Sequence, residues 1–162
     1  IKNLKTKNII DIAANQQRKK RYFMQEKTLV LIKPDAFKNH HVGDIVKLYE
    51  ENGFEILAMK MLRMDEKLAS KHYAEHVGRP YYEPLVEFMC SGPIVAMVLG
   101  GDDIIARVRK LHGATDPAKA EKGTIRSLYA ENNRMNAVHA SDSPESANRE
   151  IHIFFNETEI FD

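Results

Sequence analysis

His139 is the side chain in this sequence best suited to covalent chemistry. It lies within residues 136–143 (NAVHASDS), between a short run that favours an edge strand and a helix pattern capped by Ser143. An imidazole is a suitable phosphoryl acceptor, because about three-quarters of such rings are neutral and nucleophilic at pH 7. Nearby cations would increase the neutral fraction, and a carboxylate on the second ring nitrogen would orient the ring. Composition alone nevertheless favours a structural role for a lone histidine.

Phosphate binding, if this chain performs it, must rely on side chains. The sequence contains neither GxxxxGK[ST] nor GxGxxG, the glycine-rich patterns whose backbone holds phosphates. The candidates are polar residues that end an element or lie in a long loop: Lys33, Arg109, Thr115 and Arg126. Each of them, taken alone, is more often a solvated surface residue than a ligand contact.

A second pattern suggests a different chemistry. Residues 72–76 (HYAEH) spell H-x-x-E-H, which places His72 and His76 one helical turn apart, as in some zinc peptidases. The pattern is short enough to occur by chance on a polar helix face, so zinc is the weaker interpretation, and tightly bound stoichiometric zinc would revive it. Cys90 is the single cysteine, which excludes an intramolecular disulfide and any site built from several thiolates, and we expect it to be a buried apolar residue.

Composition and charge indicate one domain behind a basic extension. The 162 residues are 43% hydrophobic and 29% charged, without an apolar run near the roughly 20 residues that span a bilayer. Residues 1–23 carry a net charge of +6 and the remainder −5. We interpret 1–23 as a cloning-derived or flexible tail and 24–162 as the domain. An acidic domain is a poor general nucleic-acid binder, and the lone cysteine favours the cytoplasm, or an organelle if 1–23 is a native presequence.

The patterns along the domain predict an α+β protein. We expect strands over residues 28–34, 54–64, 94–99 and 136–139. We expect helices over 42–52, 65–77, 81–89, from Asp102 or Asp103 to about 111, and over 143–155. Residues 112–135 show no clear period, which is typical of a functional loop. This order matches a ferredoxin-like βαββαβ arrangement, a four-stranded antiparallel sheet covered by helices on one face.

Over residues 26–162 the sequence resembles the nucleoside diphosphate kinase family. The matching segments are 26–36 (EKTLVLIKPDA), 72–73 (HY), 79–82 (RPYY), 91–93 (SGP), 111–117 (LHGATDP), 123–126 (GTIR) and 136–143 (NAVHASDS). Each segment is a weak signal, but their number, order and spacing make coincidence very improbable.

The resemblance implies a role for each candidate residue. His139 matches the nucleophile of a ping-pong phosphoryl transfer between nucleoside tri- and diphosphates, and Ser141 and Glu150 match residues beside it, of which we expect Glu150 to orient the ring. The positions that bind phosphates and sugar are matched by Lys33, Tyr73, Arg109, Thr115, Arg126 and Asn136. Tyr81 matches an aromatic residue on which the base stacks, so broad base specificity is expected. Mg²⁺ is expected on the nucleotide phosphates, without an assigned protein ligand.

Two departures from the family pattern, and one alternative, accompany this interpretation. Ala140 replaces the usual glycine after the histidine, which would cost on the order of 1 kcal/mol if that position required a positive φ. Tyr81 replaces the usual phenylalanine. The family implies a homo-hexamer, or else a tetramer, assembled through the sheet and the loop 112–135. The alternative is a catalytically silent scaffold or nucleic-acid-binding member of the same fold.

Overall fold

An antiparallel sheet of four strands organises this protein, whose computed structural model describes residues 10–17 and 25–161. The strands are β1 (Glu26–Ile32), β2 (Glu55–Arg63), β3 (Pro93–Gly101) and β4 (Val138–Ala140). Their order across the sheet is β2-β3-β1-β4, and all three pairings are antiparallel. This is the ferredoxin-like order, so the predicted α+β fold class is confirmed.

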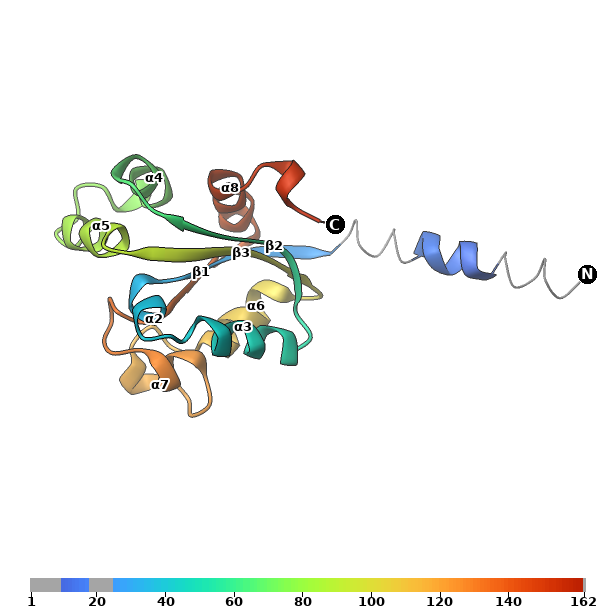
Figure 1. Ribbon diagram of the computed structural model, residues 1–162, viewed down its shortest axis with the longest axis horizontal. Coiled ribbons are helices and arrows are strands. Elements are labelled where there is room, and N and C mark those ends of the chain that lie inside the picture. The colour runs from blue at the N-terminus through green and yellow to red at the C-terminus, as the bar shows by residue number, and fades with distance from the viewer. Residues whose placement is uncertain (1–9, 18–24, 162) are drawn as a thin grey trace, which may run out of the picture.

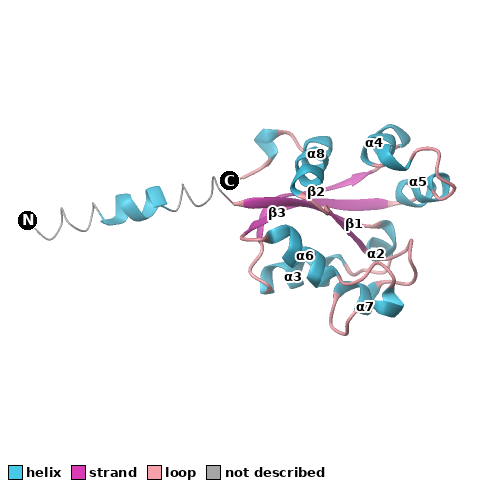
Figure 2. Ribbon diagram, turned by 180° about the vertical axis from the view of Figure 1, so that it is seen from behind, coloured by secondary structure: helices cyan, strands magenta, loops and turns pink. Residues whose placement is uncertain are grey.

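Helices cover both faces of the sheet, not one face as predicted. One face carries α2 (Pro34–Lys38), α3 (Val42–Glu51), α6 (Ile104–His112) and α7 (Ile125–Tyr129), and the other carries α4 (Glu66–His72), α5 (Tyr82–Cys90) and α8 (Pro144–Phe154) (Figures 1 and 2). Strand β1 supplies the physical reason, because Val30 and Ile32 pack into one core while Leu29 and Leu31 pack into the other. A strand buried on both sides appears in sequence as an uninterrupted apolar run, and β1 has such a run.

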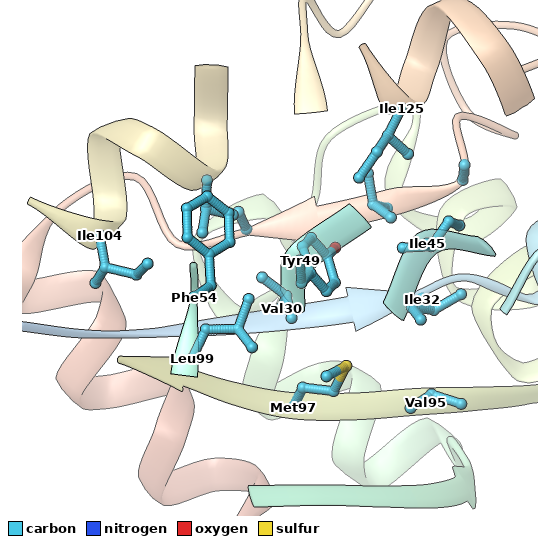
Figure 3. Close-up of a cluster of buried hydrophobic side chains, with 14 of the residues drawn as sticks. Val30, Ile32, Ile45, Tyr49, Phe54, Val95, Met97, Leu99, Ile104 and Ile125 are labelled. Carbon is cyan, nitrogen blue, oxygen red and sulfur yellow. The ribbon is translucent and has the colours of Figure 1, made fainter. Parts of the chain in front are cut away.

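The core beneath α3 and α6 fixes the elements that carry two candidate cations. Figure 3 shows Ile45 and Tyr49 of α3 beside Val30 and Ile32 of β1. Ile104 at the start of α6 and Ile125 at the start of α7 are fully buried in the same cluster. Arg109 therefore projects from a helix anchored by Ile104, and Arg126 follows directly after the buried Ile125.

Most predicted elements are confirmed to within a few residues. Ser143 caps α8 by accepting a hydrogen bond from the backbone N–H of Ser146 at 3.1 Å, as expected. The sequence missed α2, which begins at Pro34, and the short α7 inside the loop 112–135. Asp103, one of the two residues from which the sequence predicts α6 to start, adopts a left-handed conformation with φ of 51°, and its side chain makes no capping hydrogen bond to α6. Cys90 is only half-buried.

The basic extension falls mainly outside the described residues. Within it the structure describes residues 10–17, a helix whose residues are all exposed. The boundary at residue 24 therefore stays a prediction. Among the described helices, none is both long and apolar enough to cross a membrane.

Candidate active site

His139 lies at the centre of the short edge strand β4, opposite Leu31 of β1. Its Nε2 lies 3.1 and 3.2 Å from the two carboxylate oxygens of Glu150, which α8 brings over the strand. Ser141 donates a hydrogen bond to Glu150 Oε2 at 2.5 Å and is itself fully buried. The backbone N–H of Ser141 in turn donates to the carbonyl of Leu29 at 3.1 Å. The three residues thus form one chain of contacts anchored to the sheet.

The state of Glu150 determines which nitrogen of His139 is available. Burial raises the pKa of Glu150, but the hydrogen bonds from His139 and Ser141 and the charge of His139 outweigh it, so the net pKa lies below the ordinary value. An ionised carboxylate only accepts hydrogen bonds, so Nε2 must carry the proton. The lone pair of the neutral ring then lies on Nδ1.

Lys33 directly follows β1 and is almost completely buried. Its Nζ donates to the Asn136 side-chain oxygen at 2.8 Å, and the Asn136 amide nitrogen donates to the backbone carbonyls of Thr115 and Asn133 at 3.3 and 3.1 Å. Burial, and then the charge of Arg126, lower the pKa of Lys33 to about 8. These contacts join the end of β1 to both ends of the long loop.

Arg126 is held by the backbone. Its Nη1 donates to the carbonyl of Gly113 and its Nη2 to the carbonyl of Val138, each at 2.9 Å. Burial and the nearby charge of Arg109 lower its pKa to about 10, which still leaves the guanidinium charged at neutral pH. The loop residue Gly113 and the strand residue Val138 are therefore tied together through one cation.

A pocket of about 260 Å³ collects most of the candidate residues. The predicted residues that line it are Lys33, Tyr73, Arg109, Thr115, Arg126, His139 and Glu150. Asn136 and Ser141 do not line it but bond to residues that do. Tyr81 lies outside the lining, with 44% of its surface exposed. Several further residues that line the pocket were not predicted from the sequence, and among them Arg149 adds a fourth cation to Lys33, Arg109 and Arg126.

The backbone just before His139 is strained at Ala137. This residue has φ of 71°, and the N–H of Val138 donates to the carbonyl of Asn136 at 2.9 Å, which closes a γ-turn around Ala137. Asp35, which is buried, accepts from the N–H of Ala137 at 2.9 Å. The N–H of Lys33 donates to the Ala137 carbonyl at the same distance. The segment after β1 thus braces the turn from which the strand of His139 starts.

Comparisons with known proteins agree on one family. The family model "Nucleoside diphosphate kinase" matches residues 26–160. A nucleoside diphosphate kinase of Methanocaldococcus jannaschii is 51% identical over 139 residues, which is 86% of this chain and 99% of the relative. Nucleoside diphosphate kinase 1 of Protochlamydia amoebophila is 52% identical over 135 residues, which is 83% of this chain and 96% of the relative.

Solved structures give the same result. A crystal form of the Aquifex aeolicus nucleoside diphosphate kinase superposes with a TM-score of 0.82 at 45% identity, covering 84% of this chain and 99% of that one. A nucleoside diphosphate kinase of Halobacterium salinarum in complex with CDP superposes with a TM-score of 0.83 at 42% identity, covering 85% of this chain and 92% of that one. The chain belongs to the nucleoside diphosphate kinase family. The resemblance seen in the sequence and the prediction that the chain is an enzyme of this family are confirmed.

For a nucleoside diphosphate kinase, Ala140 carries none of the strain that its replacement of glycine could have caused. Within the described residues, positive φ values at residues other than glycine occur at His40, Asp103 and Ala137. Ala140 lies in β4, opposite Val30. The strained backbone lies three residues earlier than the sequence comparison indicated.

The structure gives no support to the zinc interpretation of residues 72–76. His76 Nδ1 is paired with the Tyr81 hydroxyl at 2.6 Å, while His72 lies against His139 with ring centroids 4.8 Å apart. His72, His139 and Glu150 do place potential ligand atoms within 4.8 Å of one another. Four cationic side chains line the same pocket, however, and this charge favours anionic phosphates over a dication. Burial, and then the charge of His139, lower the pKa of His72 to about 3, so its ring is neutral.

Proposed function

We propose that His139 Nδ1 is the phosphoryl acceptor of a ping-pong nucleoside diphosphate kinase reaction. The observation that carries this proposal is the contact between His139 Nε2 and the ionised Glu150. Because Nε2 is committed to that carboxylate, the second ring nitrogen keeps its lone pair on a ring that lines a cation-rich pocket. Glu150 is a positioning residue, and Ser141 holds Glu150.

The reaction then has two half-reactions at one site. Nδ1 attacks the γ-phosphorus of a nucleoside triphosphate, the bond from that phosphorus to the β–γ bridging oxygen breaks, and the diphosphate leaves with the bridging electron pair. A terminal oxygen of a second diphosphate next attacks the phosphorus, and the N–P bond breaks. Nε2 keeps its proton throughout, and Glu150 stabilises the positive charge that the ring gains in the first half-reaction.

The cations supply the second part of the proposal. Lys33, Arg109 and Arg126 would bind the phosphates, with Thr115 and Tyr73 completing the lining and Asn136 holding Lys33 while contacting the sugar. Charge-assisted hydrogen bonds from fixed cations stabilise the charge that moves between oxygens during transfer. Arg126 is suited to this role because two backbone carbonyls already fix its orientation.

The base would stack on the exposed ring of Tyr81, outside the phosphate pocket. A stacking face accepts any base, so we propose broad base specificity. The Halobacterium relative was solved with CDP, which supports a pyrimidine nucleotide as one ligand of this chain.

A divalent cation would enter with the nucleotide, and we propose Mg²⁺. Two exposed carboxylates, Glu75 and Asp142, line the pocket and offer the oxygen ligands that Mg²⁺ prefers. They fit an ion that is carried mainly by phosphates and water. When bound, the ion would neutralise phosphate charge, and the protein residues above would perform the remaining steps.

We also propose that the chain assembles as a homo-hexamer. Strand β2 is an edge of the sheet and exposes Met59 and Met61, and α7 in the long loop exposes Leu128. Exposed edges and apolar side chains of this kind favour association with further copies. A molar mass from light scattering that fits a tetramer or dimer would contradict this proposal.

A cytoplasmic location is proposed from the single half-buried thiol.

The decisive experiment is to trap the phosphoenzyme. The protein is incubated with γ-labelled ATP and Mg²⁺, quenched in alkali and tested for acid-labile label, before and after a chase with GDP. His139→Ala should abolish the label, whereas His152→Ala should not, because His152 is an exposed histidine on α8 outside the pocket. Label that depends on His139 and passes to GDP supports the proposal. Nucleotide binding without label would instead favour the silent scaffold.

A further inference from the structure

His76 and Tyr81 form a hydrogen-bonded pair at the rim of the catalytic pocket. His76 ends the 3₁₀ helix η1 (Ala74–His76), and Tyr81 directly precedes α5. The His76 Nδ1 and the Tyr81 hydroxyl lie 2.6 Å apart, and the two rings meet edge to face with centroids 5.5 Å apart. The N–H of Arg79 donates to the His76 carbonyl, and that of Tyr82 to the Arg79 carbonyl, each at 3.0 Å, so two tight turns bring the pair together.

The pair occupies two different environments. His76 is half-buried and lines the phosphate pocket, whereas Tyr81 is exposed and lies outside that lining. His76 also contacts Tyr73, with ring centroids 6.2 Å apart, and Tyr73 contacts His72 at 4.5 Å. Because His72 lies against His139, an unbroken row of rings leads from Tyr81 to the nucleophile.

We infer that His76 is a positioning residue for nucleotide binding, which fixes the Tyr81 ring as a preformed stacking face for the base. This inference rests on the proposed role of Tyr81. An exposed tyrosine without a partner samples several rotamers, and ordering it on binding costs affinity. The hydrogen bond to His76 already orders the Tyr81 ring in the free protein, so less conformational entropy is lost when the base binds. Both chemical groups are needed, since a phenylalanine at 81 or an aliphatic side chain at 76 lacks the bond.

The test is a double-mutant cycle of His76→Leu and Tyr81→Phe. A hydrogen bond of this kind contributes on the scale of about 2- to 10-fold in an equilibrium constant. Each single variant should therefore raise the KM for nucleoside diphosphates by about 2- to 10-fold, and the double variant by no more than either single one. His76→Gln, which can still bond to the hydroxyl, should restore part of the affinity. Tyr82→Phe, the same change one residue further on, should leave KM unaltered.

A base-free phosphoryl donor separates positioning from general damage. Labelling of His139 by phosphoramidate should change much less in either single variant than the KM for nucleoside diphosphates, because phosphoramidate has no base and does not use the stacking face. Tyr81→Ala distinguishes the proposed stacking role of Tyr81 from the proposed positioning role of His76. If Tyr81→Ala raises KM strongly while His76→Leu leaves it unchanged, the positioning role is wrong and the stacking role stands. If Tyr81→Ala leaves KM unchanged, the stacking role itself is wrong. Fully additive effects in the cycle would also overturn the inference.

Discussion

Replacing Glu150 with glutamine is the sharpest test of how the site makes His139 nucleophilic. Glutamine has nearly the same shape as glutamate, but its amide can donate as well as accept hydrogen bonds. An N–H directed at His139 Nε2 would favour the ring form in which the proton lies on Nδ1. That form lacks the lone pair needed for attack, and the neutral amide would also stabilise the phosphorylated, positively charged ring less well.

The contact geometry sets the size of the effect. A hydrogen bond to a charged group contributes about 1.5–3 kcal/mol. If the whole contribution is lost in the transition state, phosphorylation should slow by about 10- to 150-fold, since every 1.36 kcal/mol is a factor of ten. Little of this should appear in KM, because Glu150 is buried, contacts His139 Nε2 and is proposed to act through that ring.

Rapid quench at saturating ATP measures this step directly, because it follows formation of the phosphoenzyme in a single turnover. Glu145→Gln is the matched control, since Glu145 is an exposed glutamate in the first turn of the same helix. The ¹⁵N chemical shifts of His139 report which ring nitrogen carries the proton. A Glu150→Gln enzyme that phosphorylates within about twofold of the wild-type rate, with the proton still on Nε2, would refute the orienting role.

Other perturbations probe the cations, the backbone and the acid limit. Arg109→Ala should raise KM for nucleotides and slow transfer in steady-state assays, and unaltered kinetics would remove Arg109 from the site. Lys33 has a pKa of about 8, so the KM of wild type should rise as pH increases through 8. The KM of Lys33→Gln should already be high below pH 8 and should not change with pH in this range. Ala137→Gly exchanges about 1 kcal/mol of strain for glycine's entropic cost and should be nearly neutral, whereas Ala140→Gly should cost about 0.5–1 kcal/mol with activity retained. Thermal melts should separate the two variants by roughly 2–4 °C. Because the pKa of Glu150 is lowered in the folded protein, ionised Glu150 should stabilise the fold above the ordinary pKa of 4.5. This stabilisation should be lost as pH falls through the lowered pKa. The free energies of unfolding of wild type and Glu150→Gln, measured in urea, should therefore converge as pH falls below 4.5.

The features of the fold that could be predicted are those that depend on residues close together in the sequence. The Ser143 cap, the apolar run of β1 and the helical spacing of α3 and α8 depend on neighbours in sequence, and all three are found in the structure. The sequence pattern does not predict α2, because Pro34 suits the end of a strand as well as the first turn of a helix. The prediction that helices cover one face was wrong, because alternate side chains of β1 are buried in two different cores, one on each face of the sheet.

The predicted site shows a similar division. His139, Lys33 and Arg126 could be named from segments that resemble the family, and Glu150 and Arg109 from the positions that they match in it. The contacts that prepare these residues, however, are made over long distances along the chain. Asp35 bonds to Ala137 across 102 positions, and Lys33 bonds to Asn136 across 103. The family pattern places a glycine after His139, which suggested backbone strain at Ala140. The strain lies at Ala137 instead, because the hydrogen bonds from Ala137 to Asp35 and from Lys33 to Ala137 hold that turn at a positive φ.

In the proposed site, we expect Arg126 and Arg109 to divide the work that a ping-pong reaction requires. The same groups must hold a triphosphate in one half-reaction and a diphosphate in the next, so some must stay fixed while others follow the phosphates. Arg126 is fixed by carbonyls of the loop and of β4, on the strand that carries His139. Arg109 is exposed on α6 and lines the same pocket. A cation tied to the strand of the nucleophile keeps its distance to the transferred phosphorus, and a freer cation can adjust to the leaving or arriving diphosphate.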